Sequence, residues 1–276
     1  MPFRIQSPSS INTYKQCPRK YYYQYILKLK TLPSIHTARG NIVHSVLEDF
    51  FDTPLEEINF KNCEQKLTQR IQELLVLHWN KKKSELDSLS MEPTQLNFYF
   101  EESMVMLMNW LQKFLAKARV VNGSEFDKAF KALTPLRELQ YASEERAVRG
   151  FIDAIEQFQG ETRLMDYKTS KKFDVTNEYR LQLAIYAMLY EEKHGEKPHK
   201  VGIYFLKDTG KHEYLIDVDE DLIKLAKLEV EMIHLNTQSL KVEDYPKNIT
   251  PLCKWSTGQC DFYSPCFTQK LLSEVK

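Results

Sequence analysis

The chain has 276 residues, of which 42% are hydrophobic, enough for one substantial core with room for an inserted helical lobe. Basic and acidic residues number 38 each, so the formal net charge is zero and total charge gives no argument for a nucleic-acid partner. No apolar run approaches the length of a membrane span, and the N-terminus lacks a signal-peptide or transit-peptide pattern. We therefore expect a cytoplasmic protein without a membrane partner.

Apolar periodicity and turn residues predict a helical first half and a second half in which strands and helices mix. Helices are expected at roughly 9–29, 39–52, 55–83, 93–121, 176–194 and 219–237, with a hinge from Asp87 to Pro93. Strands are expected at roughly 138–149, 150–158, 162–168, 200–207 and 212–217. This order fits a mixed α/β core.

The first predicted helix mixes basic and aromatic side chains. Arg19 and Lys20 stand among Tyr14, Lys15, Tyr21, Tyr22, Tyr23, Tyr25, Lys28 and Lys30. Such a mixture suits single-stranded nucleic acid, whose bases stack and whose phosphates pair with cations, although the tyrosines fit a packed helix face better. Further candidates for phosphate contacts are Lys81–Lys83 and, directly after a predicted strand, Lys171 and Lys172. A solvated surface is the alternative for such charge runs.

Two short apolar runs, Gly150–Ile155 and Leu164–Thr169, read as strands joined by a turn at Gln159-Gly160. Each run carries one aspartate, Asp153 or Asp166, and Lys168 follows two residues after the second aspartate. Because side chains alternate along a strand, Asp166 and Lys168 share one face while Tyr167 points to the other. Two carboxylates and an ammonium at one sheet edge suit a hard divalent cation and an attacking water. The alternative is a local ion pair.

Two predicted helices carry polar residues whose roles the local pattern leaves open. His44 lies between Val43 and Val46 on an apolar helix face, where a histidine is more often a buried, hydrogen-bonded core residue than a ligand. Gln182 and Tyr186 are one turn apart on a later helix, which by itself is only an amphipathic pattern.

Together these segments resemble the PD-(D/E)XK nuclease superfamily, in particular its RecB-like exonuclease branch, which includes CRISPR-associated and phage iron–sulfur exonucleases. The resemblance follows the family order through Ser7–Tyr22, Gly40–His44, Gly150–Asp153, Asp166–Lys168 and Gln182–Tyr186 to a C-terminal cysteine cluster. It implies an α/β fold with a mixed central sheet flanked by helices, a restriction-endonuclease-like core. The implied layout has N-terminal helices of the core at 1–52, a helical insertion at 53–137, the core sheet and helices at 138–245, and a metal-stapled cysteine-rich tail at 246–276 that packs with Cys17.

The resemblance also implies the site. Mg²⁺ or Mn²⁺ would be held by His44, Asp153 and Asp166, with the backbone carbonyl of Tyr167 as a further ligand, since hard oxygen donors suit these ions. Lys168 would orient or deprotonate the water and steady charge on the phosphate. The remaining catalytic positions are Gln182 and Tyr186, which would line the site, and Glu144 is a weaker supporting candidate.

The cysteines form a second constellation. In iron–sulfur members of the branch, one N-terminal and three C-terminal cysteines hold a [4Fe–4S] cluster, which here implies Cys17, Cys253, Cys260 and Cys266. The spacing from Cys260 to Cys266 matches the family, whereas six residues separate Cys253 from Cys260, more than is usual. Zinc bound by four thiolates is the main alternative, and scattered reduced cysteines without a metal are the other. A disulfide framework is disfavoured by the odd cysteine count, and Cys63 is expected to be a small core residue.

Two functions from different classes follow from these expectations. The first is a divalent-metal-dependent deoxyribonuclease, an exonuclease acting on single strands or ends in recombination, repair or phage replication, with a helicase or recombination partner. The second is a catalytically inactive nucleic-acid-binding scaffold with the same fold. Because a degraded site would lose Asp153, Asp166 or Lys168, the presence of all three favours the enzyme.

Overall fold

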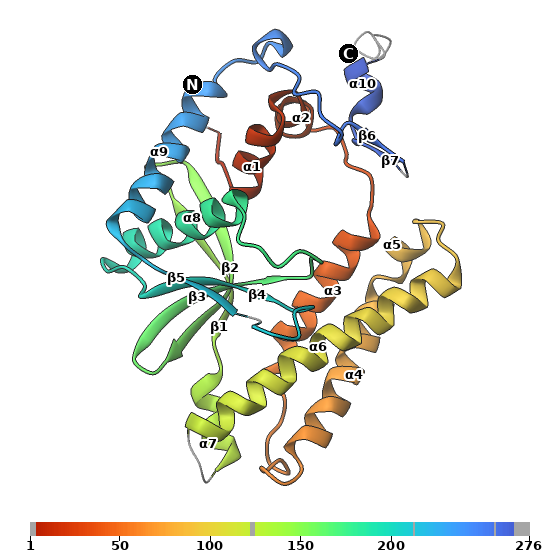
Figure 1. Cartoon of the computed structure of the whole chain (residues 1–276), viewed down its shortest axis with the longest axis vertical. Coiled ribbons are helices and arrows are strands. Elements are labelled where there is room, and N and C mark those ends of the chain that lie inside the picture. Colours follow the sequence, from red (N-terminus) through yellow and green to blue (C-terminus); the bar gives the residue numbers. More distant parts are fainter. Residues whose placement is uncertain (1–3, 122–124, 212, 257, 268–276) are drawn as a thin grey trace.

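The computed structural model describes residues 4–121, 125–211, 213–256 and 258–267, and within these it contains a five-stranded sheet in the order β1-β2-β3-β4-β5 (Figure 1). The strands are β1 (Leu136–Ser143), β2 (Val148–Phe158), β3 (Glu161–Lys168), β4 (Lys200–Phe205) and β5 (Glu213–Asp217). Position 212, the first of the expected last strand, lies outside the described residues. Only the β3–β4 pair is parallel, so the sheet is mixed and the predicted α/β fold class is confirmed.

The β2–β3 hairpin turns at the two residues that the sequence indicated. Gln159 and Gly160 both have positive φ angles, 53° and 78°, as a two-residue turn of the primed type requires. The strands pair from Phe158 opposite Glu161 up to Ala154 opposite Met165. Beyond that last pair the two strands separate, which places Asp153 and Asp166 at an open fork.

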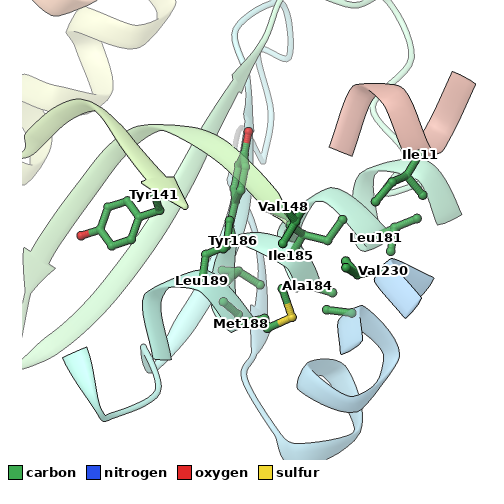
Figure 2. Packing of buried hydrophobic residues seen from close by; sticks show 14 of the residues in the cluster. Ile11, Tyr141, Val148, Leu181, Ala184, Ile185, Tyr186, Met188, Leu189 and Val230 are labelled. Atoms are coloured by element: carbon green, nitrogen blue, oxygen red, sulfur yellow. The ribbon is translucent and has the colours of Figure 1, made fainter. Parts of the chain in front are cut away.

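One face of the sheet is covered by α8 (Asn177–His194), α9 (Glu220–Asn236) and α1 (Pro8–Gln16). Helix α8 is the crossover that joins the parallel strands β3 and β4. The side chain of Thr176 caps its N-terminus, and Gly195, with φ of 74°, ends it in the left-handed region. Figure 2 shows the core that results, in which Ile11, Val148, Ile185, Met188 and Val230 pack together.

The other face is covered by α3 (Ile35–Phe50), α6 (Pro93–Val121) and α7 (Phe126–Leu133), with α4 (Cys63–Lys81) and α5 (Lys83–Asp87) packed outside them (Figure 1). Aromatic rings of Phe50, Trp110 and Phe114 meet Ala154 and Met165 of the sheet in this second core. The expected helix over 55–83 begins only at Cys63, and the short helix α7 was not predicted. The break between Asp87 and Pro93 is where we expected it.

The single helix expected over 9–29 is three pieces: α1, α2 (Pro18–Tyr21) and the π-helical turn η1 (Tyr22–Ile26). Cys17, between the first two, is extended (φ −162°, ψ 109°) because the ring of Pro18 disfavours a helical residue before it. The sequence also predicted one continuous strand from 138 to 149. Instead a turn at 144–147 separates β1 from β2, so Gly150 lies inside β2.

After the short 3₁₀ turn η2 (Val242–Asp244), the described part of the tail contains β6 (Lys254–Trp255), β7 (Gly258–Gln259) and α10 (Tyr263–Phe267), and it lies beside α2 (Figure 1). The Tyr23 hydroxyl donates to the Pro265 carbonyl (2.9 Å), and the Asn248 side chain donates to the Gln16 carbonyl (2.8 Å). These bonds connect the two ends of the chain. Among the described residues, no helix is both long enough and apolar enough to cross a bilayer.

An ionic cluster fixes helix α6 to the sheet. Lys117 of α6 lies 3.4 Å from Glu156 of β2 and 2.5 Å from Glu213 of β5, and all three side chains are less than a quarter exposed. Lys117→Met leaves two poorly solvated carboxylates facing each other without a cation. We expect it to lower the free energy of unfolding by about 3 kcal/mol, as measured by urea denaturation.

Lys131→Met is the control for that measurement. Lys131 forms an i,i+4 ion pair with Asp127 on α7, and both side chains are well exposed. Such a pair contributes no more than about 0.5 kcal/mol, so the control should unfold like the wild-type protein. Equal changes in the free energy of unfolding for the two substitutions would mean that the Lys117 cluster does not stabilise the fold more than an exposed ion pair does.

Candidate active site

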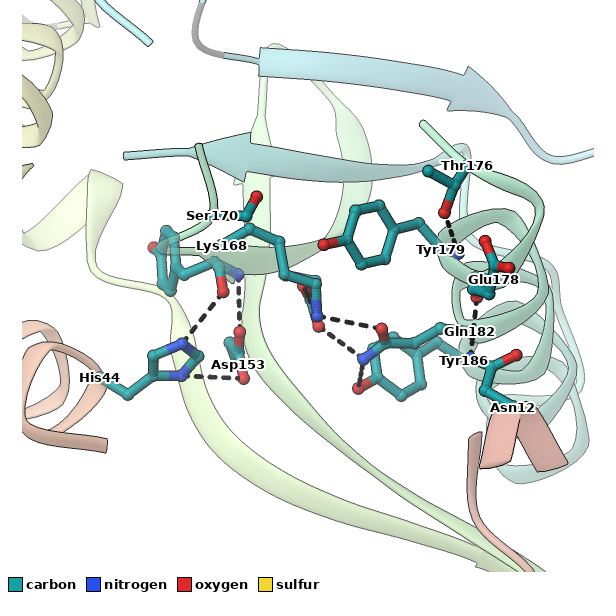
Figure 3. Close-up of polar contacts among 12 residues, drawn as sticks. Asn12, His44, Asp153, Lys168, Ser170, Thr176, Glu178, Tyr179, Gln182 and Tyr186 are labelled. Carbon is teal, nitrogen blue, oxygen red and sulfur yellow. Dashed lines mark hydrogen bonds and ion pairs between the residues drawn. The ribbon is translucent and has the colours of Figure 1, made fainter. Parts of the chain in front are cut away.

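The predicted acidic residues lie at the fork where β2 and β3 separate, between α3 on one face and α8 on the other (Figure 3). Past the fork, β3 continues with β4 alone, pairing Asp166 with Ile203 and Lys168 with Phe205. Tyr167 packs in the core under α3 and α6, whereas Asp166 and Lys168 point towards α8, as the strand alternation predicted. The opening therefore receives side chains from two strands and two helices.

Asp153 is fixed by the backbone of the neighbouring strand. Its Oδ2 accepts a hydrogen bond from the amide of Tyr167 at 2.7 Å, in place of the interrupted strand ladder. Its Oδ1 lies 3.5 Å from Nδ1 of His44, and the side chain is only 10% exposed. The carboxylate is thus held in one orientation with an oxygen directed into the fork.

His44 of α3 reaches across to the same opening, so it is not the enclosed core histidine of the alternative interpretation. Its Nε2 lies 3.0 Å from the carbonyl oxygen of Tyr167, and its Nδ1 faces Asp153 (Figure 3). The same Nδ1 lies 3.8 Å from Oε1 of Glu138. Burial alone would lower the pKa of His44, but Asp153, Glu138 and Asp166 outweigh it and raise that pKa to about 10. The carboxylates around the imidazole create a negative potential there, which suits a cation.

Glu138 of β1 is a site residue that the sequence did not reveal. Ligand atoms of His44, Glu138 and Asp153 lie within 4.8 Å of one another, a grouping that could hold a metal ion. Glu138 has a positive φ of 48°, a strained conformation for a residue with a Cβ atom. Glu144, the carboxylate we had named instead, lies in the exposed turn beyond the opposite end of β1. Glu138 could have been identified from the β1–β2 register, whose neighbouring pairs put it opposite Asp153.

Asp166 and Lys168 form a close pair at the α8 side of the fork. Lys168 Nζ lies 2.7 Å from Asp166 Oδ2 and donates to Oε1 of Gln182 at 3.1 Å. The Asp166 side chain is only 4% exposed, so burial raises its pKa, Lys168 opposes that rise and Asp153 adds to it. Burial disfavours the charged lysine as well, but Asp166 more than compensates and the pKa of Lys168 is raised. The pair is held as an ion pair in a poorly solvated place.

Gln182 and Tyr186 complete this side of the opening. The Gln182 amide donates to Asp166 Oδ1 and to the Tyr186 hydroxyl, both at 2.7 Å (Figure 3). Helical spacing on α8 brings the two residues together, as expected from their separation of one turn. Gln182 contacts both members of the Asp166–Lys168 pair and therefore sets their relative position.

A glycine makes room for Tyr186. A Cβ atom added at Gly150 would lie 2.9 Å from Cε1 of Tyr186, a ring that is itself buried. We expect Gly150→Ala to lower the free energy of unfolding by about 2 kcal/mol, as overpacked cores do. Gly40→Ala is the matched control, because a Cβ there meets only Thr169 Oγ1 at 3.8 Å inside helix α3. It should raise stability by about 0.5–1 kcal/mol in the same denaturant titration. Changes of the same sign would contradict this account.

The basic residues named from the sequence lie in three places, of which Lys81–Lys83, at the junction between α4 and α5, is the one in the helical region. Arg19 donates to the Tyr245 carbonyl (2.7 Å) and Lys20 to Gln16 (3.1 Å), so both lie where the N-terminal helices meet the tail. Lys171 and Lys172 are exposed in the loop that follows β3. Three of the neighbouring tyrosines are buried, which favours the packing interpretation for them: Tyr21, Tyr22 and Tyr23.

The four cysteines of the predicted cluster line one pocket between α2 and the tail. Cys17, Cys253, Cys260 and Cys266 are all free thiols, and the Cys260 amide donates to the Cys253 carbonyl at 3.0 Å. Cys63 is buried at the start of α4, as expected for a small core residue. The long Cys253–Cys260 segment folds back as the β6–β7 hairpin, which returns Cys253 to the pocket.

The donor set at the fork fits a hard divalent cation. It offers one imidazole, the carboxylates of Asp153 and Glu138, and the nearby Tyr167 carbonyl, with Asp166 on the adjoining strand. Oxygen-rich sets of this kind suit Mg²⁺ and Mn²⁺, whereas thiolate-rich sets suit zinc or iron. The thiols lie in the separate pocket at the tail.

Comparisons with known proteins give the family. Residues 6–267 match the PD-(D/E)XK nuclease superfamily. The crystal structure of a protein named "putative exonuclease" from Eubacterium rectale is similar at a TM-score of 0.52 and 13% identity, covering 91% of this chain and 86% of that one. The crystal structure of SSO0001 aligns at a TM-score of 0.31 and 15% identity, over 74% of this chain and 89% of that one. No curated protein matches.

At 13% identity the structural likeness concerns the fold, and it agrees with the mixed sheet flanked by helices. The family match covers nearly the whole chain, including every segment that contributes to the fork and the cysteine pocket. Nucleases of this superfamily act on phosphodiester bonds and typically use divalent metals, which fits the acidic group at the fork. The chain belongs to the PD-(D/E)XK nuclease superfamily.

Proposed function

We propose that this protein is a divalent-metal-dependent deoxyribonuclease of the RecB-like branch, an exonuclease that hydrolyses phosphodiester bonds at single-stranded regions or ends. The observation that carries the proposal is the fork itself. His44, Asp153, Asp166 and Lys168 come from α3, β2 and β3 and converge on one opening, with Gln182 linking the last two. The inactive-scaffold alternative gives no reason for so many partly buried charges at one place.

At this fork, Mg²⁺ or Mn²⁺ would be held by His44, Asp153 and Asp166, with the Tyr167 carbonyl and Glu138 as further ligands. The ion would supply Lewis-acid polarisation of the phosphate and a water of lowered pKa. Lys168, fixed by Asp166 and Gln182, orients the attacking water and stabilises negative charge on the phosphate oxygens. The Tyr186 hydroxyl accepts a hydrogen bond from the side-chain amide of Gln182 and so keeps Gln182 in place.

Residues 53–137 form, in this proposal, a helical insertion that walls the substrate, and residues 1–52 and 138–245 form the nuclease core. The name of the Eubacterium rectale protein supports the exonuclease mode. Lys171 and Lys172, directly beyond β3, contact the nucleic-acid backbone. A helicase or recombination enzyme is the expected partner in recombination, repair or phage replication, by resemblance to the branch.

The tail, 246–276, carries in this proposal a [4Fe–4S] cluster bound by Cys17, Cys253, Cys260 and Cys266; its positions 268–276 lie outside the described residues. Zinc at four thiolates would need sulfurs about 3.8 Å apart, from its bond length of 2.3 Å. In the described part of the chain, no three cysteine sulfurs lie within 4.8 Å of one another. The metal content of the purified protein distinguishes this cluster from zinc at the same four thiolates.

The test is hydrolysis of 5′- and 3′-labelled single-stranded DNA, duplex DNA and RNA with Mg²⁺, with Mn²⁺ and with EDTA. Metal-dependent loss of terminal nucleotides from single-stranded DNA is the expected result. Cleavage that persists in EDTA would contradict the metal site, and internal cuts alone would contradict the exonuclease mode. Nucleic-acid binding without hydrolysis under any of these metals would favour the scaffold.

A further inference from the structure

A second polar cluster, here called the basic corner, adjoins the fork beyond Lys168. It consists of His36 and Arg39 on α3, Lys171 in the loop after β3, and Lys207 just past β4. Two backbone contacts connect the corner to the fork. The Lys168 carbonyl accepts from the Leu206 amide at 3.0 Å, and Arg39 Nη2 donates to the Thr169 carbonyl at 3.1 Å. The corner therefore begins one residue beyond Lys168.

The charges in the corner do not balance. Arg39 and Lys207 share one carboxylate, that of Glu102 on α6: Lys207 Nζ lies 2.6 Å from Glu102 Oε1, and Arg39 pairs with the other oxygen. The side chains of Arg39 and Lys207 are only 4% and 11% exposed. The Nε of Arg39 is buried without a hydrogen-bond partner among the described residues. Two poorly solvated cations with one counter-charge leave an excess positive charge, which an incoming anion would neutralise.

Neighbouring pKa shifts reflect that excess. Burial lowers the pKa of Lys207, and the charges of Arg39 and Lys171 lower it further against the opposing effect of Glu102. Burial also lowers the pKa of His36, followed by Arg39, Lys207 and Lys171. Glu102 is the acidic group with a large effect on both pKa values. His36 and Lys171 are exposed, so the edge of the corner is open to a ligand while its interior supplies the field.

We propose that the basic corner binds a backbone phosphate of the nucleic acid, next to the phosphate that is cleaved at the fork. Lys171 and His36 contact this phosphate, while Arg39 and Lys207 stabilise its charge from beneath. The inference rests on the proposed function, since it assigns a second subsite to the same substrate. It adds Lys207, Arg39 and His36 to the substrate-binding residues and gives Glu102 the role of a competing carboxylate.

The test compares lysines at the two ends of one strand. Lys207→Gln removes a positive charge from the corner, and Lys200→Gln, the matched control, removes one at the start of β4, where Lys200 pairs with Asp217 and Glu161. Affinity for a fluorescent single-stranded DNA oligonucleotide is measured in EDTA over a series of salt concentrations. Lys207→Gln and Lys171→Gln should each weaken binding about tenfold and reduce the log–log salt slope by about 0.7. Lys200→Gln should bind like the wild-type protein.

Glu102→Gln gives the sharper result because its expected effect on oligonucleotide affinity is opposite to that of the lysine variants. If Glu102 competes with phosphate, its neutralisation tightens oligonucleotide binding even though the protein melts at a lower temperature. If the ion pairs of Glu102 with Arg39 and Lys207 only hold α6 against the core, Glu102→Gln loses stability and gains no affinity for the oligonucleotide. That result overturns the proposal.

Lys171 is exposed, so Lys171→Gln keeps the test decisive should Lys207→Gln fail to fold. Unchanged affinity in a folded Lys207→Gln or Lys171→Gln protein overturns the subsite and leaves the nuclease assignment standing. A wild-type protein that neither binds the oligonucleotide nor hydrolyses DNA overturns both.

Discussion

Replacing Lys168 or Asp166 with alanine should lower metal-dependent DNA hydrolysis by about 10³-fold, because each change removes a charge that acts on the reacting phosphate or its metal. Lys168 lies within hydrogen-bonding reach of both Asp166 and Gln182, so its ammonium has one well-defined position. Asp166→Ala removes a proposed metal ligand and also the partner that holds that ammonium. Initial rates on single-stranded DNA at saturating Mg²⁺ and at saturating Mn²⁺ measure the effect.

Lys193→Ala is the control for these rates. Lys193 lies on the same crossover helix as Gln182 but near its other end, where its ammonium rests over the ring of Tyr141. Its loss should leave the rate within about twofold of the wild-type value, as expected for a surface position away from the reacting groups. Unchanged hydrolysis by both Asp166→Ala and Lys168→Ala would defeat the assignment of the fork as the active site.

Cys260→Ala is expected to damage stability far more than chemistry. The cysteine pocket joins the junction of α1 and α2 to the tail, so a metal or cluster bound there closes a loop of more than two hundred residues. Binding free energy at such a site is folding free energy. Losing about 3 kcal/mol would lower the melting temperature by about 8 °C in a chain of this size. Specific activity of the folded fraction at low temperature should stay near the wild-type value.

Cys63→Ala separates the loss of a cluster ligand from the loss of a thiol. Cys63 is buried in α4, away from the pocket, and its truncation should cost only about 1 kcal/mol. Iron and zinc content, together with the visible absorption of the purified protein, identify the bound species. A Cys260→Ala protein that has lost its metal yet melts like the wild-type protein would refute a structural role for the pocket.

The hairpin that carries the two aspartates was readable from the sequence for physical reasons. Two short apolar runs flank Gln159-Gly160, and the glycine favours a tight turn because it adopts positive φ without strain. The alternation of side chains along a strand also placed Asp166 and Lys168 on one face. Helix α8 was predicted with nearly correct ends, because a threonine cap and a terminal glycine mark it.

Other parts of the site depend on contacts between distant segments. Glu138 reaches the fork only through the β1–β2 register, and the turn at 144–147 that sets this register is not distinguishable from a continuing strand by periodicity. Likewise, Cys17 is extended because Pro18 follows it. The helical spacing of apolar residues on both sides of Cys17 predicted one continuous helix instead. A net charge of zero conceals the basic corner, whose members come from three separate segments.

The length of the β2–β3 hairpin determines the relative positions of Asp153 and Asp166. Asp153 lies six residues before Gln159 and Asp166 six residues after Gly160, so arms of equal length place the two residues at the same level of the hairpin. One extra residue in either arm would shift the register and rotate that arm's side chains by half a period. Lengthening the second arm would turn Met165 and Tyr167 towards α8 and the fork. Asp166 and Lys168 would then face the apolar core beneath α6. The length of this hairpin therefore fixes which side chains of β3 face α8.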